Sequence, residues 1–154
     1  MLTRRYPSML ALGLTLVVAL SACGEEQPTY SYLMTHPTDL QHIYNGCVEK
    51  VVEAAVPCET VIRAQADFTD LVNQREQDPE RFGARVLQEQ ENKIYLKKQF
   101  EAAWQAYTQV GASQPPLEKL KQMRLELDKR EQAYRASEEQ VKTLMAVIAA
   151  TSSV

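Results

Sequence analysis

Apolar side chains recur at three- and four-residue steps along most of the chain, and this spacing is typical of amphipathic helices. The first stripe follows Pro37, which suits the first turn of a helix because its missing N–H would have no intrahelical partner there. We expect this helix to run from Pro37 to about Val56, because Pro57 disfavours helical geometry in the residue before it. Its apolar positions are Leu40, Ile43, Tyr44, Cys47, Val48 and Val51.

A second helix is predicted directly after Pro57 and extends to about Gln77, where Asp78 and Pro79 interrupt the pattern. Cys47 then lies in the first helix and Cys58 in the first turn of the second, on either side of a short turn. The apolar stripe of this second helix comprises Cys58, Val61, Ile62, Ala66, Phe68, Leu71 and Val72. The two helices are therefore expected to form a hairpin.

Two longer helices are predicted over residues 80–110 and 117–150, separated by Gly111 and a proline pair that end the first of them. The earlier helix has an apolar stripe at Phe82, Val86, Leu96, Phe100, Ala103, Tyr107 and Val110, interrupted by Glu89 and Lys93. The later helix repeats Leu120, Leu127, Tyr134, Val141 and Ile148 every seven residues, with Met123 and Leu144 between them and Arg130 and Ser137 as polar interruptions. The pattern predicts an antiparallel, coiled-coil-like hairpin about 45 Å long.

The N-terminal stretch has a different pattern, in which Arg4 and Arg5 precede an uncharged apolar run. The run is short for a membrane span and ends at Leu20-Ser21-Ala22-Cys23, which has the form of a lipobox. We predict that residues 1–22 are a lipoprotein signal peptide and that Cys23 carries the lipid, including palmitate. The alternative is an ordinary signal peptide that happens to precede a cysteine.

The predicted lipid determines where the protein resides. Each buried methylene of an acyl chain contributes about 0.8 kcal/mol, so two or three chains hold a protein stably on a membrane. Gly24 rather than aspartate follows Cys23. By resemblance to Gram-negative lipoproteins, this favours the outer membrane, with the protein on its periplasmic side and residues 23–30 as a polar linker.

The cysteine count supports an exported protein. Of the three cysteines, Cys23 is assigned to lipid, which leaves Cys47 and Cys58 as an even pair. We predict a disulfide between them. The alternative is a zinc site that combines both cysteines with His36 and His42, although the closely spaced ligand pairs typical of zinc sites are lacking.

Composition and charge exclude several function classes. Removing residues 1–22 leaves 132 of 154 residues, enough for one modest domain. It also lowers the net charge from −3 to −5, because that segment holds two arginines and no acid. Cations interspersed with acids do not predict nucleic-acid binding. The sequence has no glycine-rich phosphate loop, nucleophile elbow or metalloprotease motif, so we expect no enzyme, cofactor, metal or small-molecule substrate.

The stretch from Tyr30 to Cys58 resembles a known family. The run Tyr30-Ser31-Tyr32-Leu33, then His36-Pro37, then Cys47 and Pro57-Cys58, all behind a lipobox, is similar to the EexN family of small entry-exclusion lipoproteins. Its members have Tyr-Tyr-Leu-x-x-His-Pro followed by two spaced cysteines and are associated with conjugative type IV secretion. The helical segment beyond this stretch is an extension of the family core.

The resemblance implies a protein that blocks redundant conjugative DNA transfer by contacting the type IV secretion apparatus. The expected contact residues are Tyr30, Tyr32, Leu33, His36 and Pro37. An alternative role for them is structural, with the tyrosines and Leu33 packing under the hairpin and Pro37 starting it. Two other functional hypotheses stay open: a pilotin-like or structural lipoprotein that assists assembly of a secretion system, and an envelope enzyme.

The expected fold is mainly α and divides into four segments. These are the signal peptide at 1–22, the linker at 23–30, a disulfide-stapled helical region at 31–77 and a helical hairpin at 78–154. The pattern leaves open whether that hairpin packs on the stapled region or projects from it.

Overall fold

The computed structural model describes residues 28–49, 57–113 and 115–152, and every regular element within them is a helix. In chain order these are α1 (Tyr30–Thr35), α2 (Pro37–Glu49), α3 (Cys58–Gln77), α4 (Pro79–Ala112) and α5 (Leu117–Ser152). The mainly α fold expected from the sequence is confirmed. The predicted signal peptide, the lipidation residue Cys23 and the predicted continuation of the first helix to Val56 lie outside the described residues.

Helix α1 is an element that the hydrophobic pattern did not predict. It has six residues, which is too short for a helical period to appear in the sequence. Thr29 caps it, since its hydroxyl accepts a hydrogen bond from the Tyr32 backbone N–H at 3.2 Å. The chain then bends at His36 and Pro37 begins α2, as the sequence predicted.

The corner between α3 and α4 is made by the residues predicted to interrupt the pattern. Asp78 caps α4 by accepting a hydrogen bond from the Arg81 backbone N–H at 2.9 Å, and Pro79 occupies the first helical position. Helix α4 therefore starts directly where α3 ends. At its other end it includes Gly111 and ends at Ala112, two residues beyond the predicted end at Val110.

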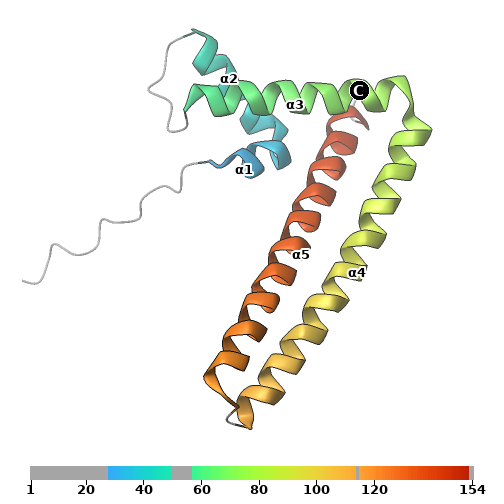
Figure 1. Ribbon diagram of the computed structural model, residues 1–154. Coiled ribbons are helices and arrows are strands. Elements are labelled where there is room, and N and C mark those ends of the chain that lie inside the picture. Colours follow the sequence, from blue (N-terminus) through green and yellow to red (C-terminus); the bar gives the residue numbers. More distant parts are fainter. Residues whose placement is uncertain (1–27, 50–56, 114, 153–154) are drawn as a thin grey trace, which may run out of the picture.

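One hydrophobic core joins the stapled region to the long hairpin. Figure 1 shows α3 crossing one end of the α4–α5 pair, with α1 and α2 beside it. Side chains from all five helices meet there: Leu33, Met34, Leu40, Val61, Ala64, Phe68, Phe82, Val86, Leu144 and Val147. The segments predicted as 31–77 and 78–154 therefore share a core rather than each enclosing its own.

The part of the hairpin between residues 89 and 134, called the arm below, projects from that core (Figure 1). Among its described residues, only Leu127 is buried. The base of the hairpin packs on the stapled region through Phe82, Val86 and Leu144. The hairpin thus both packs and projects, because only its base meets other helices.

Helix α5 buries more than its predicted seven-residue stripe. Leu127, Val141 and Leu144 of the stripe are buried, and so are the polar Ser137 and the unpredicted Val147. Val147 is fully buried although it lies off the seam that faces α4, because the core around α1 and α3 covers another side of α5 at this end.

Candidate interaction surface

Tyr30 holds α1 against α3. Its hydroxyl donates a hydrogen bond to Asp67 Oδ2 at 2.6 Å, and the guanidinium carbon of Arg63 lies 4.9 Å from the centre of its ring. Burial, followed by the hydrogen bond and the charge of Asp67, raises the pKa of Tyr30 to about 12, while Arg63 acts in the opposite direction. These contacts within the fold agree with the alternative in which Tyr30 packs under the hairpin instead of contacting a partner.

Tyr32 and His36 form an aromatic pair on the surface at the α1–α2 corner. Their ring centres are 3.9 Å apart and nearly parallel, and the Tyr32 hydroxyl donates to Asp39 Oδ2 at 2.5 Å. That hydrogen bond is the main cause that raises the pKa of Tyr32. Because the Tyr32 carbonyl can only accept, its 2.9 Å contact with His36 Nδ1 requires a proton on that nitrogen.

The remaining two sequence candidates differ in exposure. Leu33 has no exposed surface and belongs to the core, so it cannot contact a partner in this conformation. Pro37 is half-buried at the start of α2. The exposed part of the predicted contact set is therefore Tyr32 and His36, and the structure brings these two together.

The predicted disulfide between Cys47 and Cys58 is present and joins α2 to the start of α3, with the two Cα atoms 5.6 Å apart. Because both sulfurs are used in this bond, the zinc alternative with His36 and His42 loses two of its ligands. Within the described residues, no cluster of three or more histidine, cysteine or acidic side chains could hold a metal ion. No described helix combines the length and apolarity needed to cross a bilayer.

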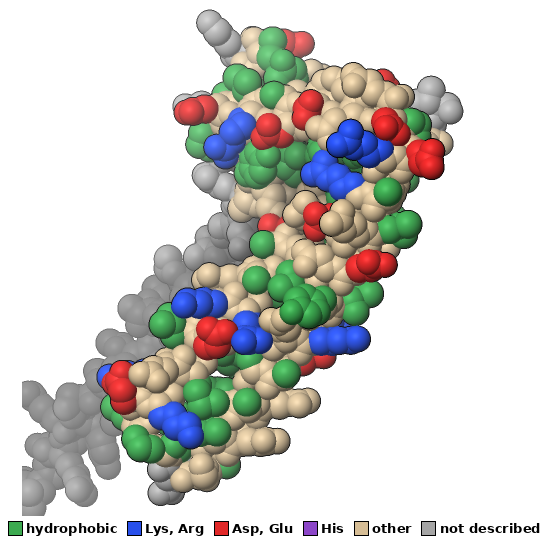
Figure 2. All heavy atoms as spheres, turned by 45° about the vertical axis from the view of Figure 1, so that its right-hand side comes forward, with side chains coloured by type: hydrophobic (Ala, Val, Ile, Leu, Met, Phe, Trp, Pro, Cys, Tyr) green, Lys and Arg blue, Asp and Glu red, His purple; other side chains and the backbone are tan. Residues whose placement is uncertain are grey.

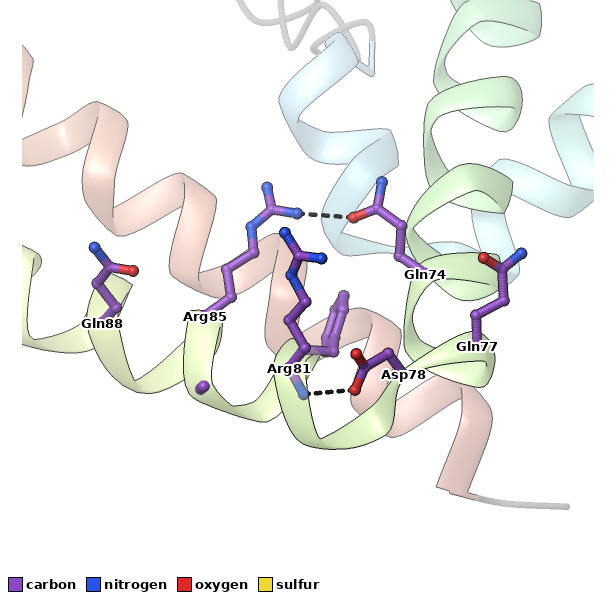
Figure 3. A pocket seen from close by; sticks show the side chains of 8 residues that line it. Gln74, Gln77, Asp78, Arg81, Arg85 and Gln88 are labelled. Carbon is purple, nitrogen blue, oxygen red and sulfur yellow. Dashed lines mark hydrogen bonds between the residues drawn. The ribbon is translucent and has the colours of Figure 1, made fainter.

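A hollow lies at the α3–α4 corner and was not predicted; polar side chains, Asp78 among them, line it together with Phe82 and Ala84. It has a volume of about 620 Å³, and Figure 3 shows the side chains of Arg81 and Arg85 pointing into it, beside Gln74. Arg85 Nη1 donates to Gln74 Oε1 at 3.0 Å. The sequence signal for this site is limited to two arginines four residues apart in the first turns of a helix.

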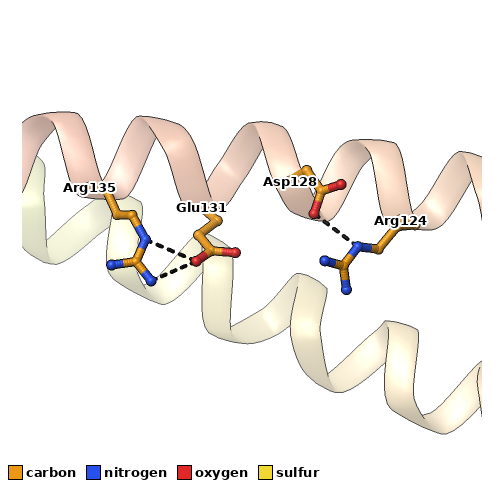
Figure 4. Close-up of polar contacts among 4 residues, drawn as sticks. All are labelled: Arg124, Asp128, Glu131 and Arg135. Atoms are coloured by element: carbon orange, nitrogen blue, oxygen red, sulfur yellow. Dashed lines mark hydrogen bonds and ion pairs between the residues drawn. The ribbon is translucent and has the colours of Figure 1, made fainter. Parts of the chain in front are cut away.

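The surface of the arm mixes charged and apolar side chains (Figure 2). Figure 4 shows two ion pairs along α5, between Arg124 and Asp128 at 3.0 Å and between Arg135 and Glu131 at 2.7 Å. Large apolar side chains are exposed between such pairs, among them Leu87 at the base and Ile94, Tyr95, Trp104, Leu117 and Leu125 on the arm. Trp104 is 48% exposed, and partly exposed tryptophans are frequent anchors of protein interfaces.

No family model, curated protein or solved structure matches the chain.

Proposed function

We propose that this protein is a lipoprotein held on the periplasmic face of the outer membrane through Cys23, and that it acts by binding another protein rather than by catalysis. The observation that carries the proposal is the Cys47–Cys58 disulfide. The remaining cysteine of the chain, Cys23, ends a lipobox. Disulfides persist in oxidising compartments such as the periplasm. A lipid tether also raises the local concentration of a binding domain against an envelope machine.

The resemblance of Tyr30 to Cys58 to entry-exclusion lipoproteins suggests which machine is contacted. The proposed role is to block redundant conjugative transfer by contact with the type IV secretion apparatus. The exposed Tyr32–His36 pair supports a contact near the tether, because it is a rigid aromatic surface held by internal hydrogen bonds.

A conjugation assay tests this role. The gene is expressed in a recipient, and transfer is measured from a donor that carries the matching conjugation system. We expect transfer to fall with the intact protein and to recover with Tyr32→Ala/His36→Ala. The matched control is His42→Ala, which replaces the exposed histidine of α2. Equal transfer into recipients with and without the intact protein would exclude the entry-exclusion role.

The arm favours a second candidate, a lipoprotein that assists assembly of a secretion system. A projecting two-helix arm with exposed Trp104 and Tyr95 can contact a partner away from the shared core. This role predicts lost secretion and unchanged conjugative uptake when the gene is deleted, so the same strains separate the two candidates.

A further inference from the structure

Arg81 and Arg85 differ from the arginines of α5 in having no acidic partner. Arg124, Arg130 and Arg135 each form an ion pair with an acid four residues away in α5. Within the described part of the chain, neither Arg81 nor Arg85 has a carboxylate within ion-pair distance. Two cations four residues apart on one helix repel each other, so their charge is available to an external anion.

The acids near the hollow are engaged by other donors. Asp78 Oδ1 accepts the backbone N–H of Arg81 at 2.9 Å. Glu89, four residues after Arg85, accepts the Gln140 side-chain amide at 3.0 Å. Glu139 and Arg85 both line a second cavity, and Glu139 does not form an ion pair with Arg85. The local acids therefore leave both guanidinium groups without a direct counter-charge.

We propose that this hollow binds a carboxylate group on an acidic segment of the partner protein, and the inference rests on the proposed function in assuming a protein partner. A guanidinium group is planar and pairs with a carboxylate through two parallel hydrogen bonds. Gln77 and Gln88 also line the hollow and supply amides that can bond to a peptide backbone, whereas the Gln74 amide is bonded to Arg85 and Asp70. A volume of 620 Å³ lies within the range of about 300–1,000 Å³ typical of ligand pockets.

The surrounding charges favour a single acidic group over an anionic membrane surface. Glu76, Asp78 and Glu80 lie around the corner that carries the two arginines. Lipid headgroups are attracted by clusters of four to eight basic residues, whereas these acids would be repelled by such a surface. Asp78 lines the hollow itself, but a side-chain carboxylate on a narrow segment can approach Arg81 and Arg85 there without covering Glu76 and Glu80, which do not line the hollow.

The test measures binding of a fluorescein-labelled peptide of alternating glutamate and alanine to the full-length lipoprotein in a non-ionic detergent. We expect saturable, salt-sensitive binding that weakens about tenfold with either Arg81→Gln or Arg85→Gln. The matched control is Arg135→Gln, which removes an arginine that is paired with Glu131 and should leave binding unchanged. Circular dichroism of each variant should show the same helical content, since Arg81 is exposed and Arg85 half-buried.

Three further probes distinguish the sources of the anion. The same peptide with glutamine in place of glutamate should not bind. Stronger competition by inorganic phosphate than by free glutamate, or arginine-dependent binding to vesicles with anionic phospholipid, would overturn the assignment to a protein carboxylate. Binding that survives Arg81→Gln/Arg85→Gln, or no saturable binding of the acidic peptide, would also overturn it.

The conjugation assay separates this inference from the proposed function. Loss of exclusion with Arg81→Gln/Arg85→Gln, and not with Arg135→Gln, supports both. Intact exclusion with the double arginine variant overturns the role of the hollow and leaves entry exclusion standing. Absence of exclusion by the intact protein overturns entry exclusion, whereas the peptide experiment still decides what the hollow binds.

Discussion

Replacing Ser137 with alanine should stabilise the protein, although it removes a hydrogen-bonding group. Ser137 is 5% exposed in the seam between α4 and α5, and its hydroxyl has no hydrogen-bond partner among the described residues. Two hydrogen bonds between the helices, from Gln140 to Glu89 and from Arg130 to Gln99, set the antiparallel register. That register places Ser137 opposite residue 92, next to the half-buried Lys93, so the seam is interrupted by polar residues on both sides.

The size of the effect follows from two terms. A buried polar group without a partner costs about 1–3 kcal/mol, and alanine removes the hydroxyl without adding volume. Alanine also has the higher helix propensity, by about 0.5 kcal/mol. We therefore expect the free energy of unfolding to rise by about 1–3 kcal/mol. For a domain of this size, each kcal/mol corresponds to a rise of about 4 °C in Tm.

Urea unfolding of the chain from Gly24 onward, followed by the helical circular dichroism signal, measures this change. The contribution of helix propensity alone is measured with Ala133→Ser, a substitution one turn earlier on α5 at an exposed position. That variant should be destabilised by about 0.5 kcal/mol. The gain from Ser137→Ala should exceed the loss from Ala133→Ser, because only Ser137 is buried.

A Ser137→Ala protein that is less stable than the wild type would refute this reasoning. Such a result would mean that the hydroxyl has a partner in solution, for example a water molecule bridging it to the opposite helix. An unchanged slope of the free energy with urea is required for either conclusion, because a changed slope indicates a change in the surface exposed on unfolding.

Three further predictions concern the disulfide, Tyr30 and the anchor. Cys47→Ser/Cys58→Ser should lower the free energy of unfolding by about 3 kcal/mol, because the bond closes a loop with a sequence separation of 11; equal urea midpoints with and without reductant in the wild type would contradict it. Tyr30→Phe should cost about 1 kcal/mol by removing the hydrogen bond to Asp67. Since the pKa of Tyr30 is raised from 10.0 to about 12, its hydroxyl should stabilise the fold fully below about pH 10 and lose this effect as the pH rises towards 12; a phenolate absorbance titration should show a tyrosine that titrates near pH 12 and that Tyr30→Phe removes. Cys23→Ser should abolish membrane fractionation of the processed chain, and its unchanged recovery with membranes would exclude the lipid anchor.

The helices were predictable from the sequence because their signals are local. Pro37, Pro57 and the Asp78-Pro79 pair determine where helices can begin and end, and the three- and four-residue spacing identifies the rest. The disulfide was predictable as well, because Cys47 and Cys58 are the even pair left beside Cys23 and are separated by 11 residues in the sequence. Helix α1 escaped prediction because six residues do not show a period.

Tertiary packing decided which of the candidate residues are available for contact. Tyr30, Tyr32 and Leu33 look alike as a short aromatic and apolar run, yet Leu33 enters the core while Tyr32 stays on the surface. Which residues of the six-residue helix α1 are buried depends on the side of α1 that packs against α3 and α5. No local feature of the sequence specifies which side of α1 this is.

The same reason explains the hollow and the arm. Arg81 is exposed and Arg85 is half-buried at the corner that also carries Gln74. The angle between α3 and α4 determines how these side chains meet. Val147 lies off the predicted stripe and is fully buried, because helices from the other half of the chain cover it. The sequence alone determined the four longer helices and the disulfide, since these depend on the local spacing of residues and on the cysteine count. The shared core, the projecting arm and the arginine hollow depend on contacts between residues far apart in the chain, so only the tertiary structure decided them.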